Sequence, residues 1–288
     1  MTDADEQTPV TKMVEDGHYY SPLVDTREIG RREPELWPAI PRMRGVDYRE
    51  PAQHALFEEL VPLMREYDFP SEPPEPLGFF RKNWMFSGLD AVFYFGLLRK
   101  LRPQRLLEIG CGFSTMLAVE TRERFLGGGR PLIACIDPYP TQFRAGPLVD
   151  KVAIIQRPVW EVEPRIVDEL EDGDVFFVDC SHVSKTGADT HTVYFDLLPR
   201  LAPGVYVQIH DIALPFEYPQ RWVVDEGRHW NEQYLLQALL TDAARYEVVF
   251  GSYFFSQFHA DAIRAAFGIE LFGGSFWLRV RPGTTPRR

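Results

Sequence analysis

The stretch Arg105-Leu-Leu-Glu-Ile-Gly-Cys-Gly-Phe-Ser-Thr115 decides the fold of this chain. It predicts a buried strand that ends with an acid, Glu108, and then breaks into a Gly-x-Gly turn before a helix. Gly110 and Gly112 let the backbone turn sharply and approach a ligand closely. Ser114 is suited to start a helix whose free N–H groups face that ligand. The stretch therefore indicates a nucleotide site at the carboxyl end of a strand.

The residues around the glycines narrow the type of nucleotide. A dinucleotide fingerprint carries a third Gly or Ala, but Met116 and Leu117 stand at that place. Glu108 would repel a pyrophosphate, whereas it suits the cationic amino-acid end of S-adenosylmethionine. The next apolar run, Leu132–Ile136, ends at Asp137, where an acid can accept hydrogen bonds from both ribose hydroxyls. Together these features predict a nucleoside pocket.

Four motifs resemble those of a known enzyme family: Leu107-Glu-Ile-Gly-Cys-Gly112, Ile136-Asp-Pro138, Phe177-Val-Asp-Cys-Ser-His182 and Val207-Gln-Ile-His-Asp-Ile212. From about residue 86 to residue 280, the chain resembles the class I S-adenosylmethionine-dependent methyltransferases. The similar bacterial group includes macrolide-sugar O-methyltransferases and cephalosporin-hydroxylase-like proteins. The resemblance implies S-adenosylmethionine as cofactor, with these binding residues: Glu108, Gly110, Gly112, Ser114, Asp137, Pro138 and Asp179.

Apolar runs alternate with helical patterns from Gly88 onward, which predicts a parallel sheet covered on both faces. Strands are expected at 105–109, 132–136, 152–156, 174–178, 205–210, 246–250 and 275–280. Helices are expected at 88–101, 114–124, 163–170, 188–198, 230–244 and 260–267. The fold class is α/β, a doubly wound, mostly parallel seven-stranded sheet of the Rossmann-like methyltransferase type, with a final hairpin-like pair. Residues 1–85 form a Pro-rich arm or cap with one helix near 52–67, and residues 86–288 form the S-adenosylmethionine-binding domain.

Composition limits the partners. The net charge of -11 and the pI near 5.2 argue against a nucleic-acid substrate, because duplex-binding surfaces carry clustered Lys and Arg. No apolar run has the length of a membrane span, and the acidic start is unlike a targeting peptide, so a cytoplasmic location is expected. Cys111, Cys135 and Cys180 lack the spacing of a zinc or redox site. A small-molecule acceptor fits best, and a homo-oligomer is left open.

Acids stand at the ends of four of the first five expected strands, and the last two of these ends are expected to hold the reaction centre. The resemblance implies that Asp179 and Asp211 are ligands of a divalent metal and that His182 is the general base. His210 departs from that pattern, which prefers a second acid. Hard Mg²⁺ favours oxygen ligands, so Mn²⁺, Fe²⁺ and Zn²⁺ stay open beside it, as does a metal-free site. His210 is then either a ligand or a second base, and His182, His210 and Asp179 form the catalytic set.

An aromatic loop follows the fifth strand, where this fold builds its acceptor pocket. Glu217, Tyr218 and Trp222 are expected substrate contacts there, and Tyr20 of the arm is a fourth. The resemblance implies O-methylation of a sugar or of a natural-product intermediate. Three alternatives stay open: a cyclisation of S-adenosylmethionine that releases methylthioadenosine, a non-haem-iron hydroxylase, and a binding protein without catalysis. The products, and a requirement for oxygen, distinguish the enzymes.

Overall fold

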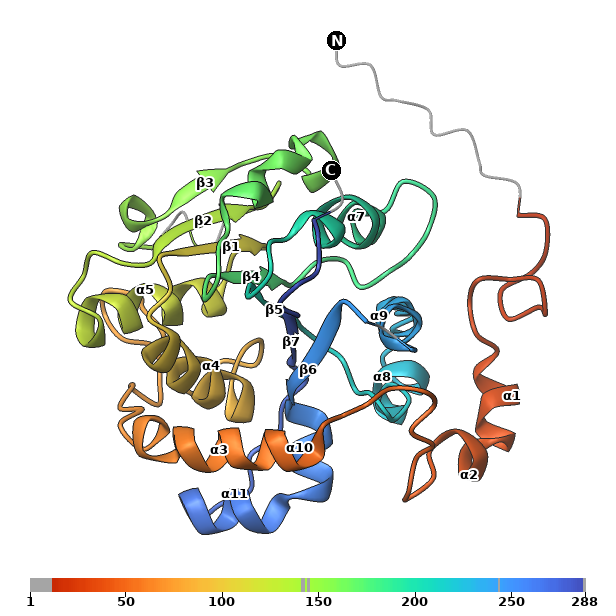
Figure 1. The fold of residues 1–288 in the computed structure, drawn as a ribbon. Coiled ribbons are helices and arrows are strands. Elements are labelled where there is room, and N and C mark those ends of the chain that lie inside the picture. The colour runs from red at the N-terminus through yellow and green to blue at the C-terminus, as the bar shows by residue number, and fades with distance from the viewer. Residues whose placement is uncertain (1–11, 141–142, 144–145, 243, 287–288) are drawn as a thin grey trace.

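A seven-stranded sheet lies at the centre of the computed structural model, which describes residues 12–140, 143, 146–242 and 244–286 (Figure 1). The strands are β1 Arg105–Ile109, β2 Leu132–Ile136, β3 Ala153–Ile155, β4 Val175–Val178, β5 Tyr206–Ile209, β6 Tyr246–Gly251 and β7 Phe276–Val280. Their spatial order is β3-β2-β1-β4-β5-β7-β6. β1 to β5 are parallel, and β7 runs antiparallel to both β5 and β6. The predicted class I methyltransferase fold and its final antiparallel pair are confirmed.

Both faces of the central strands are buried, as their continuous apolar sequences predict. All four residues of β4 are buried, and they alternate between two clusters. Val175 and Phe177 pack with α3, α4 and α5, while Phe176 and Val178 face the cluster that includes α9. The sheet is therefore fixed in register by apolar packing on two sides, and its strand ends are held firmly enough to carry a site.

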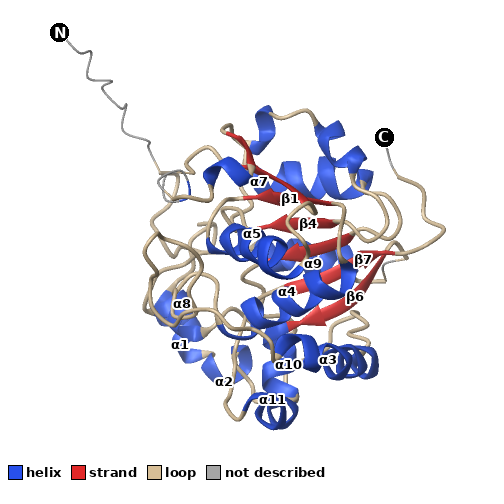
Figure 2. Cartoon of the chain, turned by 90° about the vertical axis from the view of Figure 1, so that its left-hand side faces the viewer, coloured by secondary structure: helices blue, strands red, loops and turns tan. Residues whose placement is uncertain are grey.

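Ten α-helices are assigned among the residues that the structure covers. They are α1 Thr26–Arg31, α2 Glu33–Leu36, α3 Glu50–Met64, α4 Gly88–Leu101, α5 Phe113–Phe125, α7 Asp189–His191, α8 Gln220–Val224, α9 Glu232–Leu240, α10 Ser252–Phe258 and α11 Ala260–Phe267. A π-helix over Thr192–Leu197 extends α7, and short 3₁₀ helices occupy Val149–Lys151, Val159–Glu161, Pro164–Glu169 and Leu198–Arg200. Figure 2 shows blue helices, among them α4 and α5, in front of the red strands of the sheet.

The helix predictions differ from the structure in several places. The segment 163–170 is a 3₁₀ helix, and the single helix expected at 188–198 changes type twice. α8 and α10 were not predicted, since each is short and aromatic rather than periodic. α9 begins two residues late, at Glu232, because the N–H groups of Asn231 and Glu232 both bind the carbonyl of His182. A tertiary contact therefore sets this helix start.

The N-terminal region divides into two parts. Phe57, Met64 and Phe79 are buried in the same apolar cluster as α4 and α5, so this stretch belongs to the core of the sheet domain. The helices α1 and α2 instead lie outside, where α1 contacts α8 (Figure 2). Trp37 anchors this outer part by donating its Nε1–H to the carbonyl of Tyr218 at 2.8 Å. The boundary expected at residue 85 stays a prediction.

The direction of chain winding reverses between β1 and β4. β2 and β3 follow on one side of β1, whereas β4 and β5 lie on the other. Open sheets of this kind form a crevice outside the carboxyl ends of the strands at that reversal. The acids predicted at strand ends therefore converge on one edge of the sheet. No helix in the described ranges is long and apolar enough to cross a membrane.

Candidate active site

The glycine turn after β1 presses against the end of β4. Gly110 has a φ of 95°, and its N–H donates to the carbonyl of Ile136 at 3.0 Å. A Cβ at Gly110 would lie 2.4 Å from the carbonyl oxygen of Asp179, so only glycine fits there. At Gly112 a Cβ would meet no atom within 4 Å, which leaves that backbone open toward the crevice. The space beside Gly112 would therefore let a ligand lie close to the backbone, as predicted.

Glu108 is hydrogen-bonded to the helix that follows the glycine turn. Its carboxylate is fully buried and accepts hydrogen bonds from the hydroxyls of Ser114 and Thr115, the latter at 2.6 Å. Burial raises the pKa of Glu108 to about 8, against the hydrogen bonds that lower it. The side chain therefore ties the first turn of α5 to β1. The expected contact of Glu108 with the cofactor stays a prediction. The hydrogen bond from Ser114 shows that Glu108 can orient the Ser114 side chain.

Asp137 lies where the second acid was expected, directly after β2. It is partly exposed, and one carboxylate oxygen accepts the backbone N–H of Tyr139 at 2.6 Å. Burial raises its pKa, and the negative charge of Asp179 adds to this. Pro138 follows at the same edge and is also partly exposed. The arrangement leaves a carboxylate at the rim of the crevice, in the position that suits a ribose.

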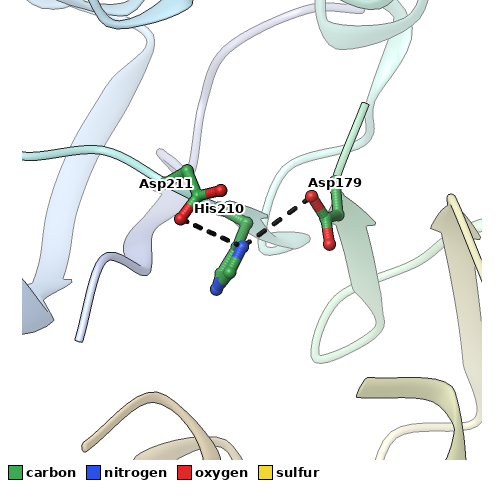
Figure 3. A group of neighbouring side chains, drawn as sticks. All are labelled: Asp179, His210 and Asp211. Atoms are coloured by element: carbon green, nitrogen blue, oxygen red, sulfur yellow. Dashed lines mark ion pairs between the residues drawn. The ribbon is translucent and has the colours of Figure 1, made fainter. Parts of the chain in front are cut away.

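Asp179, His210 and Asp211 converge where β4 and β5 end (Figure 3). His210 Nδ1 lies 3.7 Å from Asp179 Oδ1 and 3.6 Å from Asp211 Oδ1. One ligand atom from each of the three residues lies within 4.8 Å of the others. The sequence prediction that these side chains gather at one edge of the sheet is confirmed in space.

His182 completes the cluster from the other side. Its Nε2 lies 3.2 Å from Asp179 Oδ1 and 3.5 Å from Asp211 Oδ2. Its Nδ1 lies 2.8 Å from Glu232 Oε2, on the first residue of α9. The ring of Trp230 packs against the imidazole with ring centroids 4.5 Å apart. Because Glu232 occupies Nδ1, the nitrogen that faces the cluster is Nε2.

A buried carboxylate also supports His210. Asp90 of α4 lies 3.5 Å from His210 Nε2. The same carboxylate accepts the backbone N–H groups of Gly274 at 2.7 Å and Ser275 at 2.8 Å. Gly273 packs so closely on it that a Cβ would lie 2.3 Å from Asp90 Oδ1. Asp90 is thus fixed on three sides and holds the imidazole with its Nδ1 toward the cluster.

Two residues of the cluster adopt a backbone conformation that side chains disfavour. His182 has a φ of 60° and Asp211 a φ of 55°, both in the left-handed region. Neither is glycine, and each costs of order 1 kcal/mol that the surrounding contacts must offset. At His182 this offset is visible, since its carbonyl accepts N–H groups from Asn231 at 3.0 Å and Glu232 at 3.1 Å. The backbone is held where it aims the side chains at one point.

The charges of the cluster are strongly coupled. Burial lowers the pKa of His182, but hydrogen bonds to Asp179 and Glu232 outweigh this and raise it to about 10. Burial also opposes the charge on His210, yet Asp211 and Asp179 raise its pKa well above the usual value. The pKa of Asp179 is lowered because both imidazoles outweigh its burial. The surrounding carboxylates therefore favour the protonated form of both imidazoles.

The donor set fits a divalent cation. His210 Nδ1 is buried and has no hydrogen-bond partner within the described parts of the chain, although two carboxylates face it. An orphaned imidazole nitrogen between two carboxylate oxygens is a nitrogen-and-oxygen set that suits Mn²⁺ or Fe²⁺ better than Mg²⁺. The carboxylate of Asp90 behind His210 is the outer partner that metal-bound histidines usually have.

A pocket of about 250 Å³ opens beside this cluster, and it contains one of the four predicted substrate residues. Trp222 lines it together with His210 and Asp211. Tyr218 is buried, and its hydroxyl accepts the N–H of Gln233, so the expectation that it lines the pocket is wrong. Glu217 lines a different cavity, and its carboxylate accepts a hydrogen bond from the hydroxyl of Tyr234. Tyr20 is exposed on the arm, with its ring against His18 and Tyr19.

Sequence reasoning missed two carboxylates of the site. Glu232 lies at the first position of a helix, where acids are common for the helix dipole alone. Asp90 lies in the first turn of α4, which gives the same ordinary explanation. Neither is near a strand end along the chain. Only the apolar surroundings of Asp90, within the helix Gly88–Leu101, could have signalled an acid that needs a partner.

Comparisons with known proteins agree with these features. Residues 107–212 match the model of a family described as a methyltransferase domain. An uncharacterised protein of Archaeoglobus fulgidus is 32% identical over 173 residues, which cover 57% of this chain and 76% of the relative.

Two solved structures illustrate the similarity in fold. A methyltransferase of Podospora anserina with bound S-adenosylhomocysteine has a TM-score of 0.42 at 16% identity, over 88% of this chain and 94% of that chain. An O-methyltransferase of Bacillus cereus, also in complex with S-adenosylhomocysteine, has a TM-score of 0.41 at 12% identity, over 88% and 97%. At these TM-scores the two structures are no further evidence for the family, which rests on the strand order and on the family match. Over residues 107–212 the chain belongs to this methyltransferase-domain family, and its strand order is that of the class I S-adenosylmethionine-dependent methyltransferase fold.

Proposed function

We propose that this enzyme transfers a methyl group from S-adenosylmethionine to a hydroxyl of a small molecule, with a divalent cation at Asp179, His210 and Asp211. One observation carries the proposal: two imidazoles and two carboxylates from the ends of β4 and β5 meet beside the glycine turn of β1. Perturbed titratable groups that converge in this way are typical of reaction centres.

The donor side of the site is built from β1 and β2. Gly110 and Gly112 let the backbone lie against the amino-acid part of the donor, and Ser114 is oriented there by Glu108. Asp137 is placed to accept the ribose hydroxyls, because its carboxylate is only partly covered and one oxygen is held by Tyr139. Asp179 closes the pocket from β4, since its carbonyl contacts the glycine turn.

The acceptor side is built from the segments that follow β4 and β5, with support from α4 and the start of α9. A bound divalent cation would supply positive charge that lowers the pKa of an acceptor hydroxyl. His182 serves as general base, with Nε2 toward the acceptor and Nδ1 held by Glu232. Asp90 keeps His210 in place by bonding its other nitrogen. Trp230 covers the imidazole of His182 and keeps water from that face. Methyl transfer needs only this positioning and one proton acceptor.

The proposal is tested by incubating chelator-treated protein with methyl-labelled S-adenosylmethionine, Mn²⁺ and a set of hydroxylated small molecules. The expected products are S-adenosylhomocysteine and a labelled methyl ether, both in equal amounts and both lost when the cation is omitted. Release of methylthioadenosine would contradict methyl transfer. Full turnover without any cation would contradict the metal site. In a repeat with Fe²⁺, a reductant and oxygen, oxygen-dependent hydroxylation of the small molecule would instead support iron hydroxylation at the same residues.

A further inference from the structure

The pocket beside His210 and Asp211 has an acidic floor and aromatic walls. Its floor holds Asp90, His210 and Asp211, and its volume is about 250 Å³. The walls come from elements far apart in the chain, with Trp222 on α8, Tyr253 on α10 and the loop that contains Phe272. The pocket thus reaches two of the three candidate metal ligands.

Apart from the proposed metal ion, the described pocket offers an anionic ligand no permanently charged cation. The lining described by the structure contains no Lys or Arg. Arg228 is nearby in the α8–α9 loop, but its guanidinium is stacked 4.6 Å from both Trp222 and Trp230 and paired with Glu226. A divalent cation would balance Asp179 and Asp211, and the carboxylate of Asp90 would still leave the floor negative. The pocket therefore disfavours a carboxylate, sulfonate or phosphate group.

The pocket also has apolar side chains that water surrounds. Trp84 is 97% exposed, Met85 72% and Phe272 57%, and all three line the pocket. Large apolar side chains exposed together at a concave site mark a binding surface. Flat rings of this size gain most when they stack on another apolar face. An acceptor with a flat apolar face would cover them.

We propose that the acceptor is an uncharged hydroxylated compound with a flat apolar face, which stacks on Trp84 and Trp222 with its hydroxyl toward His210 and Asp211. Anionic acceptors are excluded by the acidic floor. This inference rests on the proposed function, because it assigns the pocket to the methyl acceptor. It makes the acidic floor the source of discrimination, since like charges brought close together repel strongly where water is partly excluded.

Two matched probes test the proposal: a naphthalene diol with adjacent hydroxyls, and the ring-sulfonated form of the same diol. Each is titrated by calorimetry into protein loaded with Mn²⁺ and S-adenosylhomocysteine. The neutral diol is expected to bind at least about 10-fold more tightly than the sulfonate. Similar affinities, or no binding of the neutral diol, would overturn the proposal.

Three variants locate the effect. Trp84→Ala is expected to weaken the neutral diol at least about 5-fold, while Trp160→Ala, which removes an exposed Trp elsewhere, leaves it unchanged. Met85→Lys adds a cation at the pocket and is expected to tighten the sulfonate at least about 5-fold. If Trp84→Ala binds the diol as wild type does, the stacking surface is wrong. If Met85→Lys leaves the sulfonate unchanged, charge does not set the preference.

Failure of this inference can be told apart from failure of the proposed function. Tight binding of the neutral diol with no S-adenosylhomocysteine formed from S-adenosylmethionine would contradict methyl transfer to it and leave the charge preference of the pocket intact. Equal methylation of both diols would contradict only the charge preference. The two readouts, bound probe and released S-adenosylhomocysteine, are measured on the same protein.

Discussion

The Nδ1 atom of His182 lies 2.8 Å from Oε2 of Glu232, and both side chains are buried. The backbones of the same two segments are also in contact, because the carbonyl of His182 accepts the N–H groups of Asn231 and Glu232. The end of β4 and the start of α9 are therefore locked to each other at one residue. This lock decides which imidazole nitrogen faces the reaction centre.

Glu232→Gln is expected to lower kcat by about 100-fold, in the range of lost general base catalysis, and to change donor affinity by less than about 2-fold. The amide keeps a hydrogen bond but removes the charge that orients the imidazole. Steady-state kinetics with an acceptor that the wild-type enzyme methylates, and calorimetry with S-adenosylhomocysteine, measure the two effects. Glu226→Gln, in the partly exposed pair with Arg228, is the matched control and should keep kcat. A wild-type kcat in Glu232→Gln would contradict the role of Glu232 in orienting His182 as the base.

Asp90→Asn is expected to weaken Mn²⁺ binding by about 10-fold to 100-fold, as loss of the outer partner of a metal-bound histidine does. The reason is that Asp90 holds His210 Nε2 and so directs Nδ1 to the cation. Calorimetric titration of Mn²⁺ measures the change, with Asp196→Asn on an exposed site as control. Unchanged Mn²⁺ affinity in Asp90→Asn would mean that His210 is not a ligand.

Cation binding is expected to release protons, because Asp211 and Asp179 favour the protonated form of His210, whose Nδ1 faces the proposed cation. Mn²⁺ titrations near neutral pH, in two buffers with different ionisation enthalpies, give the number released. About one proton per cation is predicted for wild type, and close to none for His210→Ala. A wild-type value near zero would show that His210 stays protonated and lies outside the coordination sphere.

The metal-free protein is expected to lose stability as the pH rises from about 7 to about 10. His182 has a folded pKa of about 10, well above the usual value, so it binds a proton more tightly when folded. That contribution is complete below about pH 6.5 and is lost as the pH rises through the folded pKa.

The melting temperature of chelator-treated protein across this range measures the effect. His182→Asn should show a smaller fall than wild type, and His18→Asn on the exposed arm should follow wild type. If His182→Asn falls as steeply as wild type, the imidazole is neutral in the folded protein.

The fold could be predicted because its strands carry strong local signals. Every strand of the sheet lies within one residue or so of its expected range, since the apolar runs that form the core are also continuous in sequence. The site was predictable where residues follow strands directly, as with Asp137, Asp179 and His210. Parallel strands bring such residues to one edge whatever the loops do.

The rest of the site depends on contacts between distant segments. Glu232 reaches His182 from 50 positions away, and Asp90 reaches Gly274 from 184 positions away, so neither has a local pattern. The acceptor loop was misread for the same reason. Tyr218 turns inward because its hydroxyl binds the N–H of Gln233 and its carbonyl binds Trp37 of the arm. Trp222 is left to line the pocket.

The most direct measurement is calorimetric binding of S-adenosylhomocysteine to chelator-treated protein, for wild type, Asp137→Ala and Asp150→Ala. Wild type and Asp150→Ala, whose acid is exposed on a 3₁₀ helix away from the strand ends, are expected to bind in the micromolar range. Asp137→Ala should bind at least about 10-fold more weakly, because a charge-assisted hydrogen bond to the ribose is lost. Absence of binding to the wild type would contradict a functional donor pocket, and equal binding to Asp137→Ala would place the ribose elsewhere.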